Sequence, residues 1–158
     1  MADASLYVNL ISQVLQNDDT LGGLVDFVVP GFRRSAADQY LAGPKQACIG
    51  IRNLQILSES LPGCYFHGGT IEDQLIEIHV IHISTEDSYA NSIVERIKDL
   101  LKGGLYCTYN AISYRVLVLR LNFAPLDGGS SSDTGLSSGA GPDRVEIIGT
   151  VRLKYLDS

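Results

Sequence analysis

A literal G-x-S-x-G pattern lies at Gly135 to Gly139, the pattern with which some hydrolases raise a nucleophilic serine on a sharp turn between a strand and a helix. Here the flanking residues are mostly glycine and serine, where a strand and a helix are required. No histidine follows the pattern, although that hydrolase fold places its catalytic histidine last in the chain. We therefore predict that Ser137 is not a nucleophile and that the match reflects local composition.

Two histidines of one segment have the chemistry to bind a metal or move protons. His79 and His82 lie three residues apart in a predicted strand, so they point to opposite faces and cannot hold one metal unless a bulge intervenes. Glu77 and His79 do share a face. For these two residues, a polar pair between neighbouring strands is a simpler interpretation than a catalytic or metal-binding pair. The sequence therefore predicts no metal site and no cofactor.

The remaining histidine and the cysteines indicate structural roles. His67 stands beside Gly68 and Gly69, and a lone histidine in a turn is usually solvated. The cysteines are odd in number and widely spaced, which fits reduced, mostly buried thiols better than a disulfide framework or a zinc site. They are Cys48, Cys64 and Cys107.

Arg33 and Arg34, with Tyr40 a few residues later, are candidates for contact with an anion. Guanidinium groups bind carboxylates and phosphates through paired N–H donors. On an acidic protein, two neighbouring arginines more often meet the carboxylates of a partner than a substrate, so we interpret these three residues as part of an interface. No glycine-rich loop with the lysine of a phosphate cradle follows a strand, and nothing in the sequence requires an enzyme.

Composition restricts the class of protein that can carry these residues. The 158 residues are 45% apolar and 19% charged, which favours a single globular domain with a substantial core. The formal net charge is -6 and the basic residues are scattered along the chain, so we expect no stable binding of nucleic acid. No apolar run approaches the ~20 residues that span a bilayer, and the N-terminus lacks the features of a signal peptide. We expect a protein that does not contact membranes and is made in a cytosol.

The N-terminal third contains the first elements that must position these residues. Apolar residues recur at helical spacing from Ser5 to Gln16, which predicts an amphipathic helix ended by Asn17 and Asp18. β-Favouring residues predict a strand over Leu24 to Val29. Phe32 to Gln46 has no clean period, so we expect a loop with a helical turn. Ala47 to Arg52 predicts a short apolar strand.

The middle of the chain gives the clearest pattern. Gln74 to Ile83 alternates apolar and polar residues and becomes apolar on both faces, which predicts a strand in the centre of a sheet. Ser84 to Asp87 offers hydroxyl and acidic groups suited to start a second helix, and Gly103 and Gly104 end it. Its apolar stripe is Ala90, Ile93, Val94, Ile97, Leu100 and Leu101.

Two further strands end the chain. We predict them over Tyr114 to Phe123 and Arg144 to Leu156, paired as a hairpin, whereas Leu105 to Ile112 is ambiguous. In the first of them, alternation places Arg120 on the face of Val116 and Val118. The predicted fold is α+β: two main helices on one face of a largely antiparallel, or mixed, sheet, with a long glycine- and serine-rich hairpin loop.

Several of these segments resemble the tail terminator proteins of tailed bacteriophages. They are the first helix (LYVNLISQVL), the apolar strand ACIGIR, the strand that runs into a helix through a threonine-acid junction (QLIEIHVIHISTEDSYANSIVERIKDLL), and the closing strand IIGTVRLKYL. The similarity covers most of the chain and consists of element order and length more than of diagnostic residues. A related head-tail connector protein has similar features.

The resemblance implies a non-enzymatic structural protein. Such proteins form a hexameric ring that caps the head-proximal end of the tail tube and joins it to the head connector. The implied partners are other copies of the chain, the tail tube protein, a head connector, adaptor or stopper protein, and the tail sheath if the tail is contractile. Genomic DNA would pass through the ring without stable binding, and the implied location is the tail neck of a virion assembled in the host cytoplasm.

Asp127 to Asp143 and Phe32 to Gln46 depart from the shorter proteins of this kind. A glycine- and serine-rich loop buries little surface and is costly to order, so we expect the 127–143 loop to gain order when it meets a neighbouring subunit, the tail tube or the connector. A passive surface loop is the alternative. The candidate interface residues are Arg33, Arg34, Tyr40, Asp127, Ser131, Asp133, Leu136 and Asp143.

Two other functions remain open at the level of sequence. A head-closure or other neck protein would bind a portal or head adaptor without capping tail tubes. A small hydrolase or ligand-binding domain would need a convergent pocket around His67 or His79.

Overall fold

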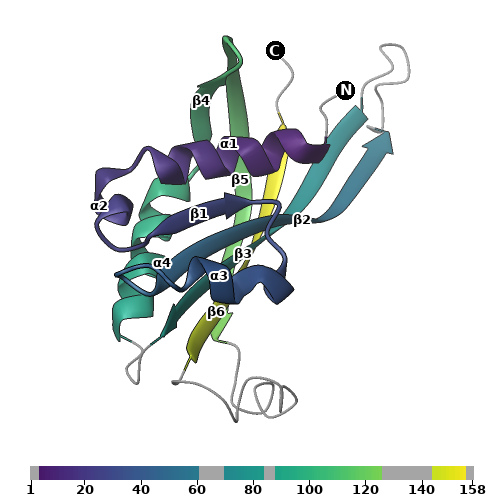
Figure 1. Cartoon of the computed structure of the whole chain (residues 1–158). Coiled ribbons are helices and arrows are strands. Elements are labelled where there is room, and N and C mark those ends of the chain that lie inside the picture. Colours follow the sequence, from purple (N-terminus) through teal and green to yellow (C-terminus); the bar gives the residue numbers. More distant parts are fainter. Residues whose placement is uncertain (1–3, 61–69, 84–87, 126–143, 156–158) are drawn as a thin grey trace.

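The chain forms an α+β fold around one six-stranded sheet with the strand order β1-β2-β3-β6-β5-β4 (Figure 1). The computed structural model describes residues 4–60, 70–83, 88–125 and 144–155. The helical elements are α1 (Ala4–Gln16), α2 (Asp19–Gly22), the 3-10 turn η1 (Arg34–Ala36), α3 (Ala37–Tyr40) and α4 (Ser88–Leu101). The strands are β1 (Phe27–Pro30), β2 (Ala47–Ser60), β3 (Thr70–Ile83), β4 (Leu105–Tyr109), β5 (Ile112–Pro125) and β6 (Arg144–Tyr155).

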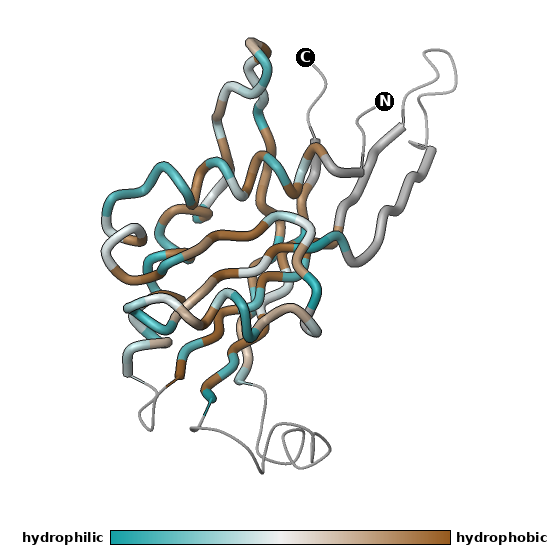
Figure 2. The backbone as a smooth tube through the Cα atoms, viewed as in Figure 1, coloured by the Kyte–Doolittle hydropathy of each residue, from teal (hydrophilic) through white to brown (hydrophobic). Residues whose placement is uncertain are grey.

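β3 lies inside the sheet, as its apolar pattern predicts. It pairs antiparallel with β2 on one side and with β6 on the other. Ile76, Ile78 and Val80 are fully buried on one face, and Ile81 is fully buried on the other. Because both faces are covered near its C-terminal end, polar residues there must find partners within the protein. Figure 2 shows hydrophobic stretches running through β1, β2 and β3 at the centre of the molecule.

The two long helices α1 and α4 pack on the same face of the sheet, which confirms the predicted arrangement. α1 lies mainly over β1 and β2, and α4 over β3 and β6. Their apolar stripes and the strands beneath form one core, which includes Tyr7, Leu10, Ile11, Leu15, Ile49, Ile51, Ile76, Ile78, Ile93 and Ile97. Leu100 of the predicted stripe is half-buried at the margin of this core.

The opposite face of β2 and β3 is covered by the segment between β1 and β2. This segment contains η1 and α3, so the predicted loop with a helical turn is confirmed. Phe32, Ala37 and Leu41 are buried there against Cys48 and Ile81. The segment therefore closes a second, smaller core that the predicted two-helix arrangement does not include.

The sheet is mixed, because β1 pairs parallel with β2 while the other neighbours are antiparallel. β1 begins at Phe27, later than the predicted Leu24. The reason is local: the backbone N–H groups of Leu24 and Val25 both bond to the carbonyl of Leu21 at the end of α2. A segment that closes a helix cannot also pair as a strand.

Other boundaries differ from the sequence-based expectations. β2 extends to Ser60 and so includes residues from Leu54 onward that show no clear period, and the ambiguous stretch after Gly104 contains the five-residue edge strand β4. The predicted pairing of the last two strands, β5 with β6, is confirmed. Gly103 and Gly104 have φ values of 83° and 144°, so they end α4 as expected. The predicted turns around Cys64 and the predicted helix start at Ser84 to Asp87 lie outside the described residues.

Candidate assembly surface

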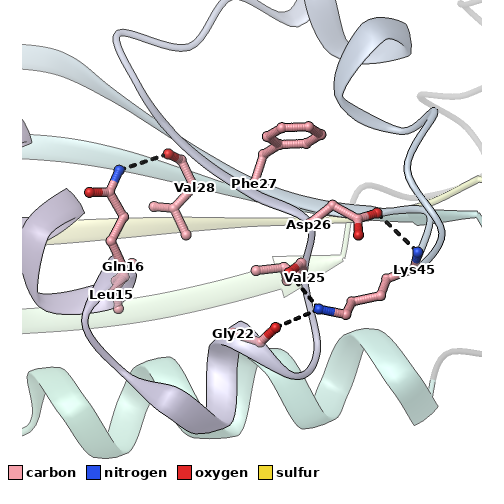
Figure 3. A pocket seen from close by; sticks show the side chains of 8 residues that line it. All are labelled: Leu15, Gln16, Gly22, Val25, Asp26, Phe27, Val28 and Lys45. Carbon is pink, nitrogen blue, oxygen red and sulfur yellow. Dashed lines mark hydrogen bonds between the residues drawn. The ribbon is translucent and has the colours of Figure 1, made fainter.

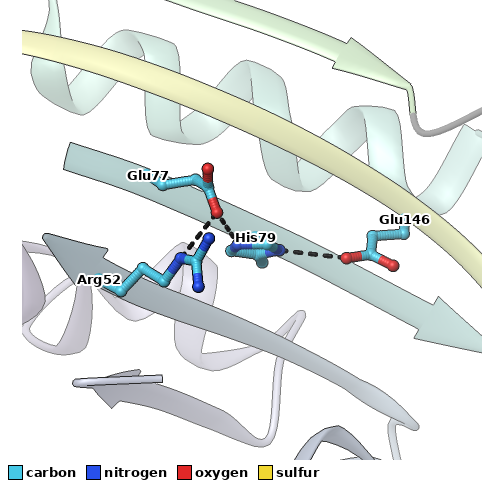
Figure 4. Close-up of polar contacts among 4 residues, drawn as sticks. All are labelled: Arg52, Glu77, His79 and Glu146. Carbon is cyan, nitrogen blue, oxygen red and sulfur yellow. Dashed lines mark hydrogen bonds and ion pairs between the residues drawn. The ribbon is translucent and has the colours of Figure 1, made fainter. Parts of the chain in front are cut away.

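A charged cluster lies between three strands of the sheet (Figure 4). His79 of β3 is 4% exposed, and its Nδ1 lies 3.1 Å from Oε1 of Glu146 on β6. Its Nε2 lies 2.5 Å from Oε1 of Glu77, two residues before it on β3. The same Glu77 oxygen accepts a hydrogen bond of 2.9 Å from Nε of Arg52 on β2. Because a carboxylate only accepts, the ring must donate from both nitrogens for both contacts to be hydrogen bonds.

This geometry fits a structural role better than a catalytic one. The prediction that Glu77 and His79 share a face is confirmed, and the cross-strand partners are Arg52 and Glu146. The ring of Phe32 covers His79, with the two ring centroids 5.3 Å apart. The side chains of His79 and Glu146 are at most 5% exposed, so the imidazole and the carboxylate contact each other and are shielded from solvent. The cluster ties β2, β3 and β6 together.

His82 lies on the other face of β3, as predicted. Its ring stacks on Tyr89 of α4 with the centroids 4.2 Å apart. Burial lowers the pKa of His82, because the charged imidazolium loses water there. The two histidines face opposite sides of the sheet and do not converge on one metal. Within the described ranges, no group of three or more histidine, cysteine or acidic residues is arranged to hold a metal ion.

The described cysteines are free thiols. Cys48 is fully buried, and burial is the main cause that raises its pKa to about 12. Cys107 is half-buried, and its pKa is also raised by burial. Because the thiolate is the reactive form, both side chains behave as small apolar residues at neutral pH. Cys64 lies outside the described residues, as do His67 and the Gly135 to Gly139 pattern.

A hollow of about 250 Å³ lies between α1, the end of α2 and β1 (Figure 3). Its polar groups already serve the fold. Nζ of Lys45 donates to the carbonyls of Gly22 and Val25, and the Asp26 carboxylate accepts from the backbone N–H groups of Lys45 and Gln46. A second hollow, of about 380 Å³, lies between the end of α4 and β5. Neither hollow contains His79, one of the two histidines around which a hydrolase or ligand-binding site was expected to form, and His67 lies outside the described residues.

The exposed features of the fold are edges and projections. β1 and β4 are the two outermost strands, and β4 with β5 forms a hairpin that projects beyond α1 (Figure 1). Large apolar side chains are exposed on these elements: Phe27 on β1, Tyr106 on β4, and Ile112 and Leu119 on β5. Tyr106 is 79% exposed. Unpaired strand edges and exposed aromatic residues are typical of surfaces that meet another protein chain.

The structure describes three of the eight candidate interface residues. Arg33 is exposed, and Arg34 begins η1. Tyr40 is half-buried, with its ring centroid 5.7 Å from that of Phe27 and 6.4 Å from that of Phe32. Their role in an interface stays a prediction. The other candidates, Asp127, Ser131, Asp133, Leu136 and Asp143, lie outside the described residues.

Sequence reasoning missed a group of arginines that the fold brings onto one face. The predicted alternation in β5 is interrupted by a bulge between Val118 and Arg120. The bulge shifts the alternation by one residue, so Arg120 lies opposite Arg152 of β6, away from the buried face that Val116 lines. The prediction that Arg120 shares the face of Val116 and Val118 is therefore wrong.

Arg115 points to the same side as Arg120. It lies opposite Tyr106 of β4, and the next outward residue of β5, Leu117, lies opposite Lys154, two residues along β6 from Arg152. Arg115, Arg120, Arg152 and Tyr106 are all exposed. We call these four residues the arginine face. Basic residues that are scattered in the sequence are thus gathered in the structure.

Comparison with known proteins gives a match at the level of fold. No protein-family model and no curated protein matches the sequence. Among solved structures, the fold is similar to a chain from the virion of a native gene transfer agent (GTA) particle, with a TM-score of 0.56 and 14% sequence identity. The match covers 94% of this chain and 92% of that chain. The similarity to the chain from that virion therefore extends over most of the fold and is not limited to one motif. Among the described helices, none has the length and apolar character needed to cross a membrane.

Proposed function

We propose that the protein is a structural component of a phage-like particle, and more specifically a tail terminator that acts as a homo-hexameric ring. The observation that carries the proposal is the fold shared from end to end with a chain of a GTA virion. The element order and the four sequence segments that resemble tail terminators point the same way. The proposed role is non-enzymatic and places the protein at the neck of the tail.

The exposed features suit assembly. A ring requires two different surfaces on each subunit, because each copy binds its neighbour head to tail. The fold offers two outer strands, β1 and β4, at opposite ends of one sheet, with exposed Phe27 on one and Tyr106 on the other. The proposed partners along the tail axis are the tail tube protein on one side and a head connector, adaptor or stopper protein on the other. A sheath protein is a further partner if the tail is contractile.

Two of the sequence hypotheses belong to this proposal. The 127–143 segment serves as an assembly contact, and the net charge of -6 allows genomic DNA to pass the ring without stable binding. Deletion of Gly129 to Gly141 should then leave the monomer folded but weaken ring formation or joining to the tail. Normal assembly by the shortened protein would remove the segment from the proposal.

The first test is the mass of the purified protein across a concentration series, measured by light scattering. The proposal predicts hexamers that increase with concentration, followed by binding to one end of isolated tail tubes. Binding to a portal or head adaptor without capping of tubes would instead favour a head-closure or other neck protein. A concentration-independent monomer that binds neither tubes nor connectors would contradict both virion roles.

A further inference from the structure

The three C-terminal strands carry a charge opposite to that of the rest of the chain. β4, β5 and β6 contain five basic residues, Arg115, Arg120, Arg144, Arg152 and Lys154, and one acidic residue, Glu146. Their formal charge is therefore +4, and because the whole chain has -6, the remaining residues carry -10. Glu146 is buried against His79, and Arg144 forms an ion pair with Asp38 of α3.

The arginine face has the composition of a protein interface. Arg120 lies directly opposite Arg152 of β6, and Arg115 lies on the same face of β5, where both β5 arginines are exposed. An acidic partner would complement the positive charge of Arg115 and Arg120. Arg115 lies directly opposite Tyr106, and arginine and tyrosine are among the residue types most enriched at energetically dominant interface positions. In the described part of the chain, α4 contacts β5 and β6 from the other face of the sheet, whereas α3 contacts β6 on this face, through the ion pair between Asp38 and Arg144.

We propose that the arginine face binds a second copy of this chain through that copy's acidic 127–143 segment. The segment contains Asp127, Asp133 and Asp143 and no lysine or arginine, so its charge complements the face. The contact joins two different surfaces, which is the head-to-tail geometry that closes rings. This inference rests on the proposed ring and names the contact that holds its subunits together.

The length of the segment permits such a contact. Eighteen residues separate Pro125 of β5 from Arg144 of β6. At ~3.3 Å per residue they provide a contour of ~60 Å, so a segment anchored at both ends can extend ~30 Å from its own subunit. A second copy is a better partner for this face than DNA, because the rest of each molecule repels phosphates and attracts another copy's arginines.

The test uses charge reversal with charge-conserving controls. In the full-length chain, the double variant Arg115→Glu with Arg120→Glu should raise the dissociation constant for self-association at least about tenfold, because like charges then meet. The double variant Arg115→Lys with Arg120→Lys keeps the positive charge and should assemble far better than the glutamate double variant. The segment variant Asp127→Lys with Asp133→Lys should also assemble poorly. Circular dichroism and thermal unfolding of each variant confirm that the monomer is folded.

Mixing the two defective proteins provides the decisive result. A face with two glutamates and a segment with two lysines attract each other, so the mixture should recover contacts that neither variant forms alone. Wild-type association should weaken as salt is added, since exposed charges are screened. Recovery in the mixture supports the contact.

The possible failures are distinct. If wild-type chains form hexamers and both reversed variants form them equally well, the proposed contact is wrong while the ring stands. The contact is also wrong if charge reversal on the face abolishes binding of a short DNA duplex and leaves self-association unchanged, because the face then serves nucleic acid. A wild-type chain that stays monomeric and does not cap tail tubes contradicts the ring and the contact together.

Discussion

The aromatic ring of Phe32 occupies the space that a side chain on Gly50 would need. A Cβ atom on Gly50 would lie inside the contact distance of three ring carbons of Phe32. Gly50 pairs with His79 across β2 and β3, so the ring lies over both residues. A glycine in the middle of a strand thus allows the segment before α3 to close over the charged cluster.

Substitution Gly50→Ala should destabilise the protein by about 1 to 3 kcal/mol, because the ring of Phe32 must move away from the sheet. Chemical denaturation measures the change. Gly22→Ala is the matched control, since a Cβ atom there meets nothing within 4 Å, and its effect should be small. The double variant with Phe32→Leu should lose less stability than the two single changes together. Equal effects of the Gly50 and Gly22 substitutions would contradict the packing described.

Replacement of His79 removes the imidazole ring that lies between the carboxylates of Glu77 and Glu146. We expect His79→Leu to lower the free energy of unfolding by about 3 to 5 kcal/mol, since Glu146 is 5% exposed and loses its partner on β3. The double variant His79→Leu with Glu146→Leu should cost less than the single change, because the buried carboxylate is removed as well. Arg52→Ala removes a partly exposed partner and should cost less than about 1 kcal/mol. A double-mutant cycle with no coupling between residues 79 and 146 would refute the cluster.

The contact between Asp18 and Arg96 should make stability depend on pH in the acidic range. Arg96 of α4 donates to both carboxylate oxygens of Asp18, at 3.0 and 2.6 Å, and this bonding lowers the pKa of Asp18. The stabilising contribution is therefore present above the carboxyl group's ordinary pKa and is lost as the pH falls through the lower folded-state value. Asp18→Asn preserves an N-cap residue for α2 but removes the charge.

We expect the melting temperature of Asp18→Asn to fall below that of the wild type at pH 7 and to approach it as the solution becomes acidic. Thermal unfolding followed by circular dichroism at a series of pH values measures this difference. A difference of constant size at neutral and strongly acidic pH would show that the charge is not its source.

His82 should produce a second protonation effect, at a higher pH. Its folded-state pKa is lowered by burial, so between that value and the ordinary value of about 6.5 only the unfolded chain binds the proton. Stability is therefore full above pH ~6.5 and decreases as the pH falls through this window. His82→Phe keeps a ring against Tyr89 and should show a flatter dependence between pH ~7.5 and ~5.5. Parallel curves for the two proteins would rule out His82 as the titrating group.

Local sequence patterns determined the main elements and the class of fold. Helical periodicity predicted α1 and the apolar stripe of α4, and alternation with a period of two predicted β3, β5 and β6. These patterns are visible in the sequence because the buried face of a helix or strand requires apolar residues at regular intervals. Gly103 and Gly104 correctly predicted where α4 ends. The same patterns established that Glu77 shares a face with His79 and that His82 does not.

Contacts between residues far apart in the chain were decided by the tertiary structure. Glu146 is 67 residues from His79, and no local pattern indicates that they meet. The order of strands, the parallel pairing of β1 and the packing of Phe32 on Gly50 depend in the same way on how separate elements pack. The arginine face depends on one bulge in β5, which reverses the side to which Arg120 points. The sequence of one strand predicts that successive side chains point to opposite faces of the sheet. A bulge interrupts this alternation, and its position depends on how two strands pair, so it cannot be found from one strand alone.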